Sequence, residues 1–544
     1  MPEPFPNILS DSKEDNNPAI LLFGRRFFSD QTIPELLIEL LLVFISKKRI
    51  SDTEIKKMEF PDLDSLNGWP EKSYLEYLPK HRLNLKLFSF LSGSKLETRH
   101  ESHIEHYREL ENKIKGSLNI SGVESKEKVI FLLKNLFFGF QNIGGDRTWC
   151  AQNFFPISSQ LIAGESIWRS VAYKKAKDSS TWHDASYKNF FDHNQKLFLA
   201  RGGEVLFLQI CNALRQPLNE VNNWLESSGI NFNSEEKDLE KLIKNLNLYL
   251  KESITDIPEA FGDLAIFIDE KIDPETDKQT YVKKENEGKG YFKSGWCPKE
   301  TWKEGFLFCI EMLRLCQTEI DIIERILLLE TACAFQVLRT LSAQSSRYYS
   351  SDKFDKKFAS PLGYVWAVSD IEGKNENLKR ISRRSAETNS LIIQNAVRNE
   401  NILNQLKQKK IEPKLKNADV KYGYKYFGKI ARNMGFMVPR RGTGARFVLN
   451  DHLLRFLVLT IVRPGERMTY DSFIDQVFLK YGIAIGKKYL SKAIQWCNLH
   501  KIDSLGDDID SWVIEMLNAS GMLVSLSDSC SMIENPFKSK RVDS

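Results

Sequence analysis

The stretch of sequence that decides the fold is Thr301–Ser345, which reads TWKEGFLFCIEMLRLCQTEIDIIERILLLETACAFQVLRTLSAQS. Apolar side chains recur in it with the period of an α-helix, at Phe306, Ile310 and Leu313 and again from Ile323 onward. A helix that is apolar on most of its faces is buried in a core. The pattern predicts two long buried helices, or one kinked helix, at the centre of a mainly α, multi-domain protein.

The composition of the whole chain is typical of a globular protein. It has 544 residues, of which 42% are hydrophobic and 27% are charged. At roughly 150 residues per domain, this length predicts three or four domains. The hydrophobic fraction excludes wholesale disorder. The most apolar run, Ile33–Ile45, includes Glu35 and Glu39 and is shorter than the roughly 20 residues that cross a bilayer. We therefore expect a core helix there and no membrane contact.

The cysteine pattern and the first residues indicate the cellular compartment in which the protein works. Eight cysteines are scattered along the chain and none of them forms a CxxC pair. This argues against a disulfide framework and against a zinc site made of four cysteines. The first residues are polar and acidic, without the basic and apolar regions of a signal peptide. We expect a cytoplasmic protein.

The last third of the sequence changes from long helices to short ones separated by glycine turns. Three short helices, a further helix and a β-hairpin follow one another there, which is the order expected of a winged-helix-like module. The expected segments are a flexible leader (1–20), a helical N-terminal domain (21–260), a polar loop or hairpin insertion (261–300), a long-helix region that is basic at its C-terminal end (301–415), a winged-helix-like module (416–537) and a tail (538–544).

The charge is concentrated in one part of the chain. The formal net charge is +5, from 77 Lys and Arg against 72 Asp and Glu. Residues 374–446 contain 18 Lys or Arg and five acids, a net charge of +13, which leaves −8 for the other 471 residues. Segregated positive charge is typical of a surface that binds a polyanion. The alternative is a charged helix that lies across acidic surfaces of the same protein or of a partner.

The basic block contains groups suited to nucleic acid. Residues 421–429 alternate lysines with aromatic rings, which suits phosphate contact together with base stacking. Residues 440–446 place arginines beside glycines at a predicted hairpin tip. A predicted helix over 487–500 has lysines at its N-terminal end, where the helix dipole favours phosphate, although these could equally be the solvated face of a packed helix. The expected nucleic-acid-binding residues are Lys421, Lys425, Lys429, Arg432, Arg440, Arg441, Arg446, Lys487, Lys488 and Lys492.

One segment suggests a metal-dependent nuclease. Asp263, Asp269 and Lys271 would project from one side of an apolar strand. Nucleases of the PD-(D/E)xK type use two acids to hold Mg²⁺ and a lysine to orient the attacking water. These three residues are the candidate catalytic residues of this alternative, and Mg²⁺ is expected only with it. The first acid lies closer in sequence to the second than the usual arrangement requires.

A histidine repeat is the other candidate for metal binding. His100, His103 and His106 recur every third residue on a probable helix, and two of them could share a metal with a neighbouring carboxylate. The repeat is one residue short of HExxH and its neighbours are charged, so an exposed charged face is the simpler interpretation. Phosphate-binding loops of the GxxxxGK[ST] and GxGxxG types are absent from the sequence. We predict no cofactor.

Three stretches, Asn142–Gln152, Phe198–Leu206 and Ser525–Phe537, resemble as a group accessory proteins of bacterial and archaeal anti-phage or restriction-type gene clusters. The resemblance spans most of the chain and carries over no catalytic residue. It implies a subunit that works beside a methyltransferase, helicase or nuclease. With the basic block, it predicts a non-enzymatic DNA-associated subunit of a defence system that binds double-stranded DNA. The alternatives are a Mg-dependent nuclease effector and a protein–protein scaffold of a defence complex.

Overall fold

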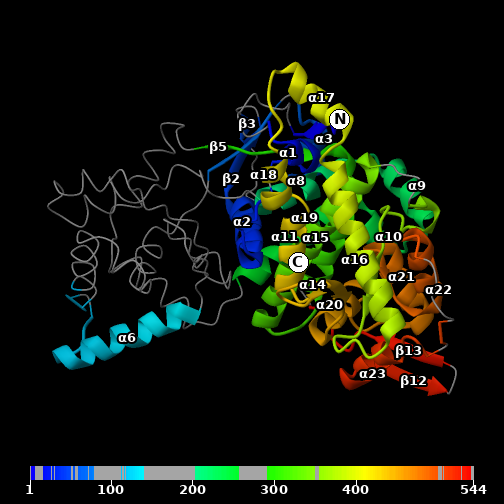
Figure 1. Cartoon of the computed structure of the whole chain (residues 1–544). Helices are drawn as coiled ribbons and strands as arrows, with labels where there is room; N and C mark the ends of the chain where they lie inside the picture. Colours follow the sequence, from blue (N-terminus) through cyan, green and yellow to red (C-terminus); the bar gives the residue numbers. More distant parts are fainter. Residues whose placement is uncertain are drawn as a thin grey trace.

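The computed structural model describes residues 2–6, 16–78, 112–139, 202–255, 291–349, 354–499 and 505–540, with short gaps in the second, third and last ranges. This described part is mainly α-helical, as the sequence predicts. Figure 1 shows most of the helices gathered into one body, from which α6 (Val123–Gly139) stands apart.

Two long helices form the centre of the body. α14 (Trp302–Gln317) and α15 (Ile322–Tyr348) come from the apolar stretch and are separate helices, not one kinked helix. The Asp321 carboxylate accepts hydrogen bonds from the backbone N–H groups of Ile323 and Glu324, at 2.9 and 3.3 Å, and so begins α15. α8 (Gly202–Leu214), all of whose residues are buried, packs on α14 and on α2 (Ile33–Ile45).

α2 and α8 approach each other closely because α8 begins with two glycines. A Cβ atom on Gly203 would lie 2.3 Å from the carbonyl oxygen of Leu36 and 2.5 Å from the backbone nitrogen of Leu40. The N–H of Gly203 donates to the Glu39 carboxylate at 2.9 Å, and the N–H of Gly202 donates to the Gln31 side chain at 3.1 Å. Side chains of α2 and of the residues before it therefore cap the first turn of α8.

The N-terminal residues belong to the packed body. β1 (Pro4–Phe5) pairs with β6 (Cys297–Pro298), and the Phe5 side chain is buried. α1 (Pro18–Phe23) is buried over its whole length. The expectation of a flexible leader over 1–20 is therefore wrong for residues 2–6 and 16–20, because their few apolar side chains enter the core.

A four-stranded antiparallel sheet has the order β3-β2-β4-β5. β5 and β6 both come from the segment expected to be a polar loop or hairpin, of which residues 291–300 are described. The strands are β2 (Lys47–Ile50), β3 (Thr53–Glu54), β4 (Leu75–Leu78) and β5 (Phe292–Lys293). The other helical elements of this half are α3 (Leu63–Asn67), α6 (Val123–Gly139), α9 (Leu218–Ser228), α10 (Ser234–Lys237), α11 (Leu239–Thr255) and the 3-10 turn η2 (Lys299–Thr301).

A second four-stranded sheet, of order β11-β7-β9-β8, lies in the C-terminal half. β7 is parallel to both β9 and β11, and β8 is antiparallel to β9. The expected domain boundary between 415 and 416 falls inside this unit, because strands from both sides of it share one sheet under α16. The elements are η3 (Lys356–Phe358), β7 (Trp366–Ser369), α16 (Glu376–Ala396), α17 (Glu400–Gln408), α18 (Leu415–Lys421), α19 (Tyr424–Asn433), β8 (Met437–Val438), β9 (Arg446–Val448) and β11 (Ile483–Ala484).

The last elements include a three-stranded antiparallel sheet of order β10-β13-β12. The short helices expected here are present, and α21 (Tyr470–Tyr481) ends at Gly482, whose backbone is left-handed. The elements are α20 (Asp451–Ile461), β10 (Arg467–Thr469), α21 (Tyr470–Tyr481), α22 (Gly486–Trp496), α23 (Ser511–Ala519), β12 (Leu523–Ser527) and β13 (Cys530–Glu534).

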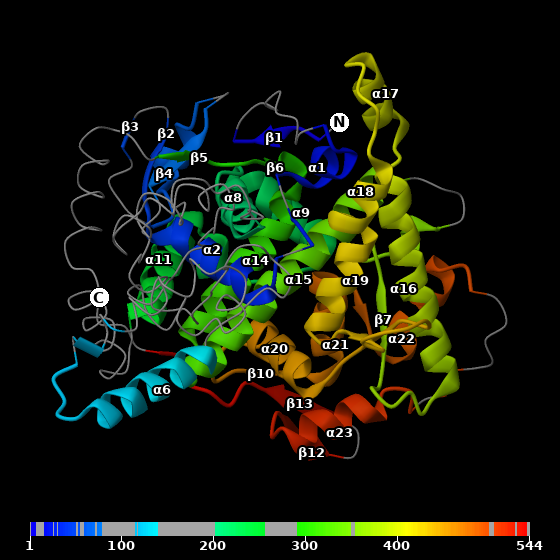
Figure 2. The same ribbon diagram turned by 60° about the vertical axis from the view of Figure 1, so that its left-hand side comes forward.

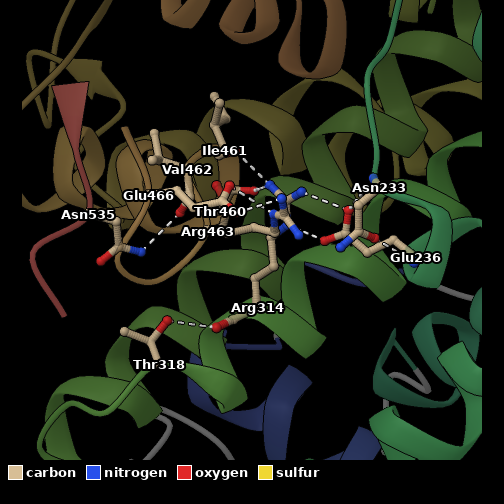
Figure 3. A network of polar contacts seen from close by, with 10 residues as sticks. All are labelled: Asn233, Glu236, Arg314, Thr318, Thr460, Ile461, Val462, Arg463, Glu466 and Asn535. Atoms are coloured by element: carbon tan, nitrogen blue, oxygen red, sulfur yellow. Dashed lines mark hydrogen bonds and ion pairs between the residues drawn. The ribbon is translucent and has the colours of Figure 1, made fainter. Parts of the chain in front are cut away.

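Arg314 joins the helical body to the C-terminal elements (Figure 3). Its guanidinium donates to both carboxylate oxygens of Glu236 at 2.7 and 2.9 Å, and to the carbonyl oxygens of Thr460 and Ile461 at 2.8 and 2.6 Å. Arg314 is 3% exposed and Glu236 is 5% exposed. Burial alone would raise the pKa of Glu236, but the Arg314 guanidinium outweighs burial and the pKa lies below its ordinary value. Because the last carbonyls of a helix have no partner within the helix, Arg314 also caps α20.

Distant parts of the chain contact the two ends of α14. β1 lies beside β6 and η2, which lead into the start of α14. At the other end, the Lys540 N–H donates to the carbonyl of Gln317 at 2.6 Å, and the Glu319 N–H donates to the carbonyl of Lys538 at 2.9 Å. Residues 538–540 of the expected tail are therefore tied to the central helix.

α15 is long and apolar enough to cross a membrane, judged by length and composition alone. In the described part of the chain it is the one helix that passes this test, and 94% of its most apolar window is buried inside the protein. Core helices of globular proteins share both properties. α15 serves here as one of the two central helices of the fold.

Glu330 is a carboxyl group on α15 inside the core. It is 6% exposed, and its Oε1 atom has no hydrogen-bond partner among the described residues. Burial raises the pKa of Glu330 to about 8. Since the folded state holds this proton more tightly than the unfolded state, the free energy of unfolding falls as the pH rises from the ordinary pKa toward 8.

We expect Glu330→Gln to remove this pH dependence. Glutamine has no proton to lose, so the variant gains stability over the wild type as the pH rises, by at most about 1.4 kcal/mol per pH unit. Urea unfolding of both proteins at about pH 5 and about pH 8 measures the difference. An identical difference at both pH values would contradict a raised pKa.

Candidate nucleic-acid interface

Most exposed cations of the basic block lie on three helices, on the turns that join them and on one loop, and the others (Lys374, Arg380 and Arg383) lie on or just before α16. Figures 1 and 2 show α17, α18 and α19 one below the other along the molecule. The loop 439–445 between β8 and β9 follows α19. We call this surface the basic column; its exposed cations are Lys407, Lys409, Lys410, Lys414, Lys416, Lys421, Lys425, Lys429, Arg440 and Arg441.

α19 presents its cations on one face. Lys425, Lys429 and Arg432 recur at the spacing that places side chains on one side of a helix, and Phe427 and Ile430 are buried on the other side. Lys429 donates to the carbonyl of Ser29. The neighbouring Lys421 ammonium lies 5.3 Å from the centre of the Phe28 ring. Residues 28–29 thus pack beside this face and contact Lys429 of α19 and Lys421 at the end of α18.

The β8–β9 loop carries Arg440 and Arg441 at its exposed tip. Arg432 anchors the loop, since its guanidinium donates to the carbonyls of Pro439 and Gly428, both at 3.2 Å. Gly442 has φ +100° and Gly444 has φ +76°, values that L residues with a side chain rarely adopt. The glycines allow the tight turn that exposes both arginines.

Arg383 on α16 adds a cation that the sequence did not single out. A Cβ atom on Gly444 would lie 3.3 Å from the Arg383 guanidinium, so this arginine adjoins the loop. Within the described ranges, no carboxylate forms an ion pair with Arg383, Lys425, Arg440 or Arg441. The one signal for Arg383 in the sequence was its place in the basic block. Its position beside the loop comes from the packing of α16 on the sheet, which the sequence does not show.

Arg446 does not belong to the exposed surface, contrary to the expectation. It is 7% exposed, and its guanidinium donates to the Ser369 hydroxyl at 2.7 Å and to the carbonyls of Asp370 and Ile371 at 2.8 and 2.5 Å. Burial lowers the pKa of Arg446. The residue points inward from β9, where it ties the sheet to the segment after β7.

The lysines of α22 have partners in the protein. Lys488 forms an ion pair with Asp475 at 2.7 Å, and the Lys492 ammonium lies 5.2 Å from the ring of Tyr489. At the start of α22, a Cβ atom on Gly486 would lie 3.1 Å from the Asp510 carboxylate. Lys487 is exposed. Because acidic groups of the protein already lie at this helix end, the structure favours the alternative of a solvated, packed helix.

The candidates for metal chemistry fall outside the described residues. These are Asp263, Asp269 and Lys271 of the nuclease alternative and His100, His103 and His106 of the histidine repeat. Among the residues that are described, no group of three His, Cys, Asp or Glu side chains is arranged to hold a metal ion.

Two of the three stretches that carry the family resemblance, Phe198–Leu206 and Ser525–Phe537, lie at least partly in the described residues, and residues in them have structural roles. Gly202 and Gly203 begin α8 against α2. Asn535 is fully buried and its amide donates to the carbonyl of Val462 at 2.9 Å (Figure 3), while its N–H donates to the carbonyl of Glu466 at 3.1 Å. Asn535 therefore joins the end of β13 to the turn after α20. The stretch Asn142–Gln152 lies outside the described residues.

Comparison with known proteins gives no match to a family model, to a curated protein or to a solved structure.

Proposed function

We propose that the protein is a non-enzymatic, DNA-associated accessory or recognition subunit of a bacterial or archaeal anti-phage defence system. The observation that carries the proposal is the basic column, whose exposed cations come from α17, α18 and α19, from the turns that join them and from the β8–β9 loop. Lys425, Arg440 and Arg441 in it have no acidic partner among the described residues. Phosphate contacts of this kind supply most of the affinity of sequence-independent DNA binding. The column is this protein's surface for the DNA backbone.

We also propose a winged-helix-like module over the last elements. Its support is the order of α20, β10, α21 and α22, then α23 with the β12–β13 hairpin, and the sheet order β10-β13-β12. Winged-helix modules also serve as protein-docking units. Enzymatic activity comes from partner subunits in this proposal, and the protein works in the cytoplasm. Its six described cysteines are buried and free of disulfides, in keeping with a reducing compartment.

Charge removal at the loop tip tests the proposed function. We expect Arg440→Gln/Arg441→Gln to weaken duplex binding roughly 10- to 100-fold and to lower the slope of log Kd against log salt by about 2, since each lost phosphate contact lowers it by about 1. A fluorescence anisotropy titration between about 50 and 200 mM salt measures both. Arg446 is left intact because it is buried.

The matched control is Lys241→Gln/Lys244→Gln on α11, which removes two exposed cations far from the column in sequence. It should bind DNA like the wild type. Equal affinities of the loop variant and the wild type would reject the loop as a DNA contact, and absence of duplex binding by the wild type would reject the proposed function.

A further inference from the structure

We infer that the basic column takes duplex DNA by its phosphate backbone, along roughly one helical turn, and that it does not bind single strands by stacking. This inference rests on the proposed function and specifies its ligand. It depends on three observations: the burial of the aromatic rings, the length of the column and the charge of the helix before the C-terminal hairpin.

The aromatic rings interleaved with the lysines are not available to bases. Tyr426 and Phe427 are fully buried, and Tyr422 is 8% exposed. Phe427 packs 6.2 Å, centre to centre, from Phe447 in the core beneath α19. Sequence-independent single-strand binders hold the bases on exposed aromatic side chains. Of the rings in residues 421–429, only Tyr424 is partly exposed, so the outer surface offers mainly ammonium and guanidinium groups.

The dimensions of the column match a short duplex. α18 has 7 residues and α19 has 10. At about 1.5 Å per residue their lengths add up to roughly 25 Å, and the 9 residues of α17 bring the sum to roughly 40 Å, which is the greatest length that the three helices give the column when they follow one another end to end. At about 3.4 Å per base pair, roughly 40 Å corresponds to about 12 base pairs. A duplex of that length can contact cations from α17 to the β8–β9 loop.

The C-terminal hairpin unit is unsuited to the same ligand. Residues 505–537, which include α23 and the hairpin, contain six acids and no Lys or Arg. α23 comes directly before the hairpin, and its exposed charged side chain is Glu515. Winged-helix proteins that read base sequence place a helix of this kind in the major groove. Phosphates would repel the Glu515 carboxylate, so we place no base readout on α23.

The test is an anisotropy titration of the full chain with labelled duplexes of about 6, 9, 12 and 16 base pairs and the corresponding single strands. We expect affinity to rise up to about 12 base pairs and then to level off. Single strands of about 16 nucleotides should bind at least roughly tenfold more weakly than the duplex, and two unrelated duplex sequences should bind equally.

Variants at the two ends of the column locate the ligand. With the longest duplex, Lys407→Gln/Lys410→Gln near the end of α17 and Arg440→Gln/Arg441→Gln in the loop should each lower the salt slope by about 2. Glu515→Gln should bind no more weakly than the wild type, with Lys241→Gln/Lys244→Gln as the control for charge.

The outcomes separate the two proposals. If no nucleic acid binds, the proposed function fails and this inference with it. If DNA binds, four results would overturn only this inference. They are single strands that bind as tightly as duplexes, an affinity that does not depend on duplex length, variants at one end of the column that leave binding unchanged, and weaker binding by Glu515→Gln.

Discussion

Arg314→Met is expected to destabilise the protein by about 3–5 kcal/mol. Methionine fills much of the volume of arginine but cannot satisfy the Glu236 carboxylate or the carbonyls of Thr460 and Ile461, all of which Arg314 contacts. A buried charge that loses its partner costs far more than an exposed pair contributes. Urea unfolding followed by circular dichroism measures the loss.

The control for this prediction is Arg463→Met. Arg463 pairs with Glu466 in the turn just after α20, and both side chains are well exposed, at 39% and 48%. That variant should lose less than about 1 kcal/mol. A double variant, Arg314→Met/Glu236→Leu, should recover part of the stability, because it removes the unpaired carboxylate as well. Equal losses for the two single variants would contradict the role given to Arg314.

Gly203→Ala is expected to cost about 3 kcal/mol or more. Its Cβ atom would lie 2.3 Å from a backbone oxygen of α2 and 2.5 Å from a backbone nitrogen, so no side-chain rotation relieves the clash. The two helices must separate, and both are buried in the core. Since Gly203 also donates to Glu39 at 2.9 Å, the separation would weaken the cap of α8.

The measurement for Gly203→Ala is the midpoint of thermal unfolding, with Gly506→Ala as control. Gly506 has open space around its Cα atom, so a methyl group there meets nothing within 4 Å. Gly506→Ala should unfold at nearly the wild-type temperature. A Gly203→Ala midpoint equal to that of the control would show that α2 and α8 are not in such close contact.

Local signals in the sequence were sufficient to predict many elements. α21 begins after the capping residue Thr469, whose hydroxyl accepts from the Ser472 N–H at 3.3 Å, and it ends at a glycine with φ +70°. The helices α14 and α15 were predictable for the same kind of reason, since their apolar period is continuous. Such signals lie within a few residues of the element that they define.

Long-range pairing was not predictable in this way. β7 lies between β9 and β11, which follow it much later in the chain, so the break proposed at 415 missed one shared sheet. The candidate surface shows the same limit. Net charge located the basic block, but only packing decides that Arg446 points inward from β9 and that Arg383 lies beside the β8–β9 loop. Winged-helix architecture and DNA binding stay predictions.

The contacts at the two ends of α14 have a consequence for synthesis on the ribosome. Residues 4–5 are made early and must wait for residues 297–298 before they can pair. The end of α14 gains its partners only when residues 538–540 have emerged. The packing at the two ends of α14 is thus completed by segments translated at very different times, and closing such long loops slows folding. Until the last of these residues leaves the exit tunnel, apolar surface around α14 is open to chaperones, so we expect the nascent chain to depend on them more than the finished protein does.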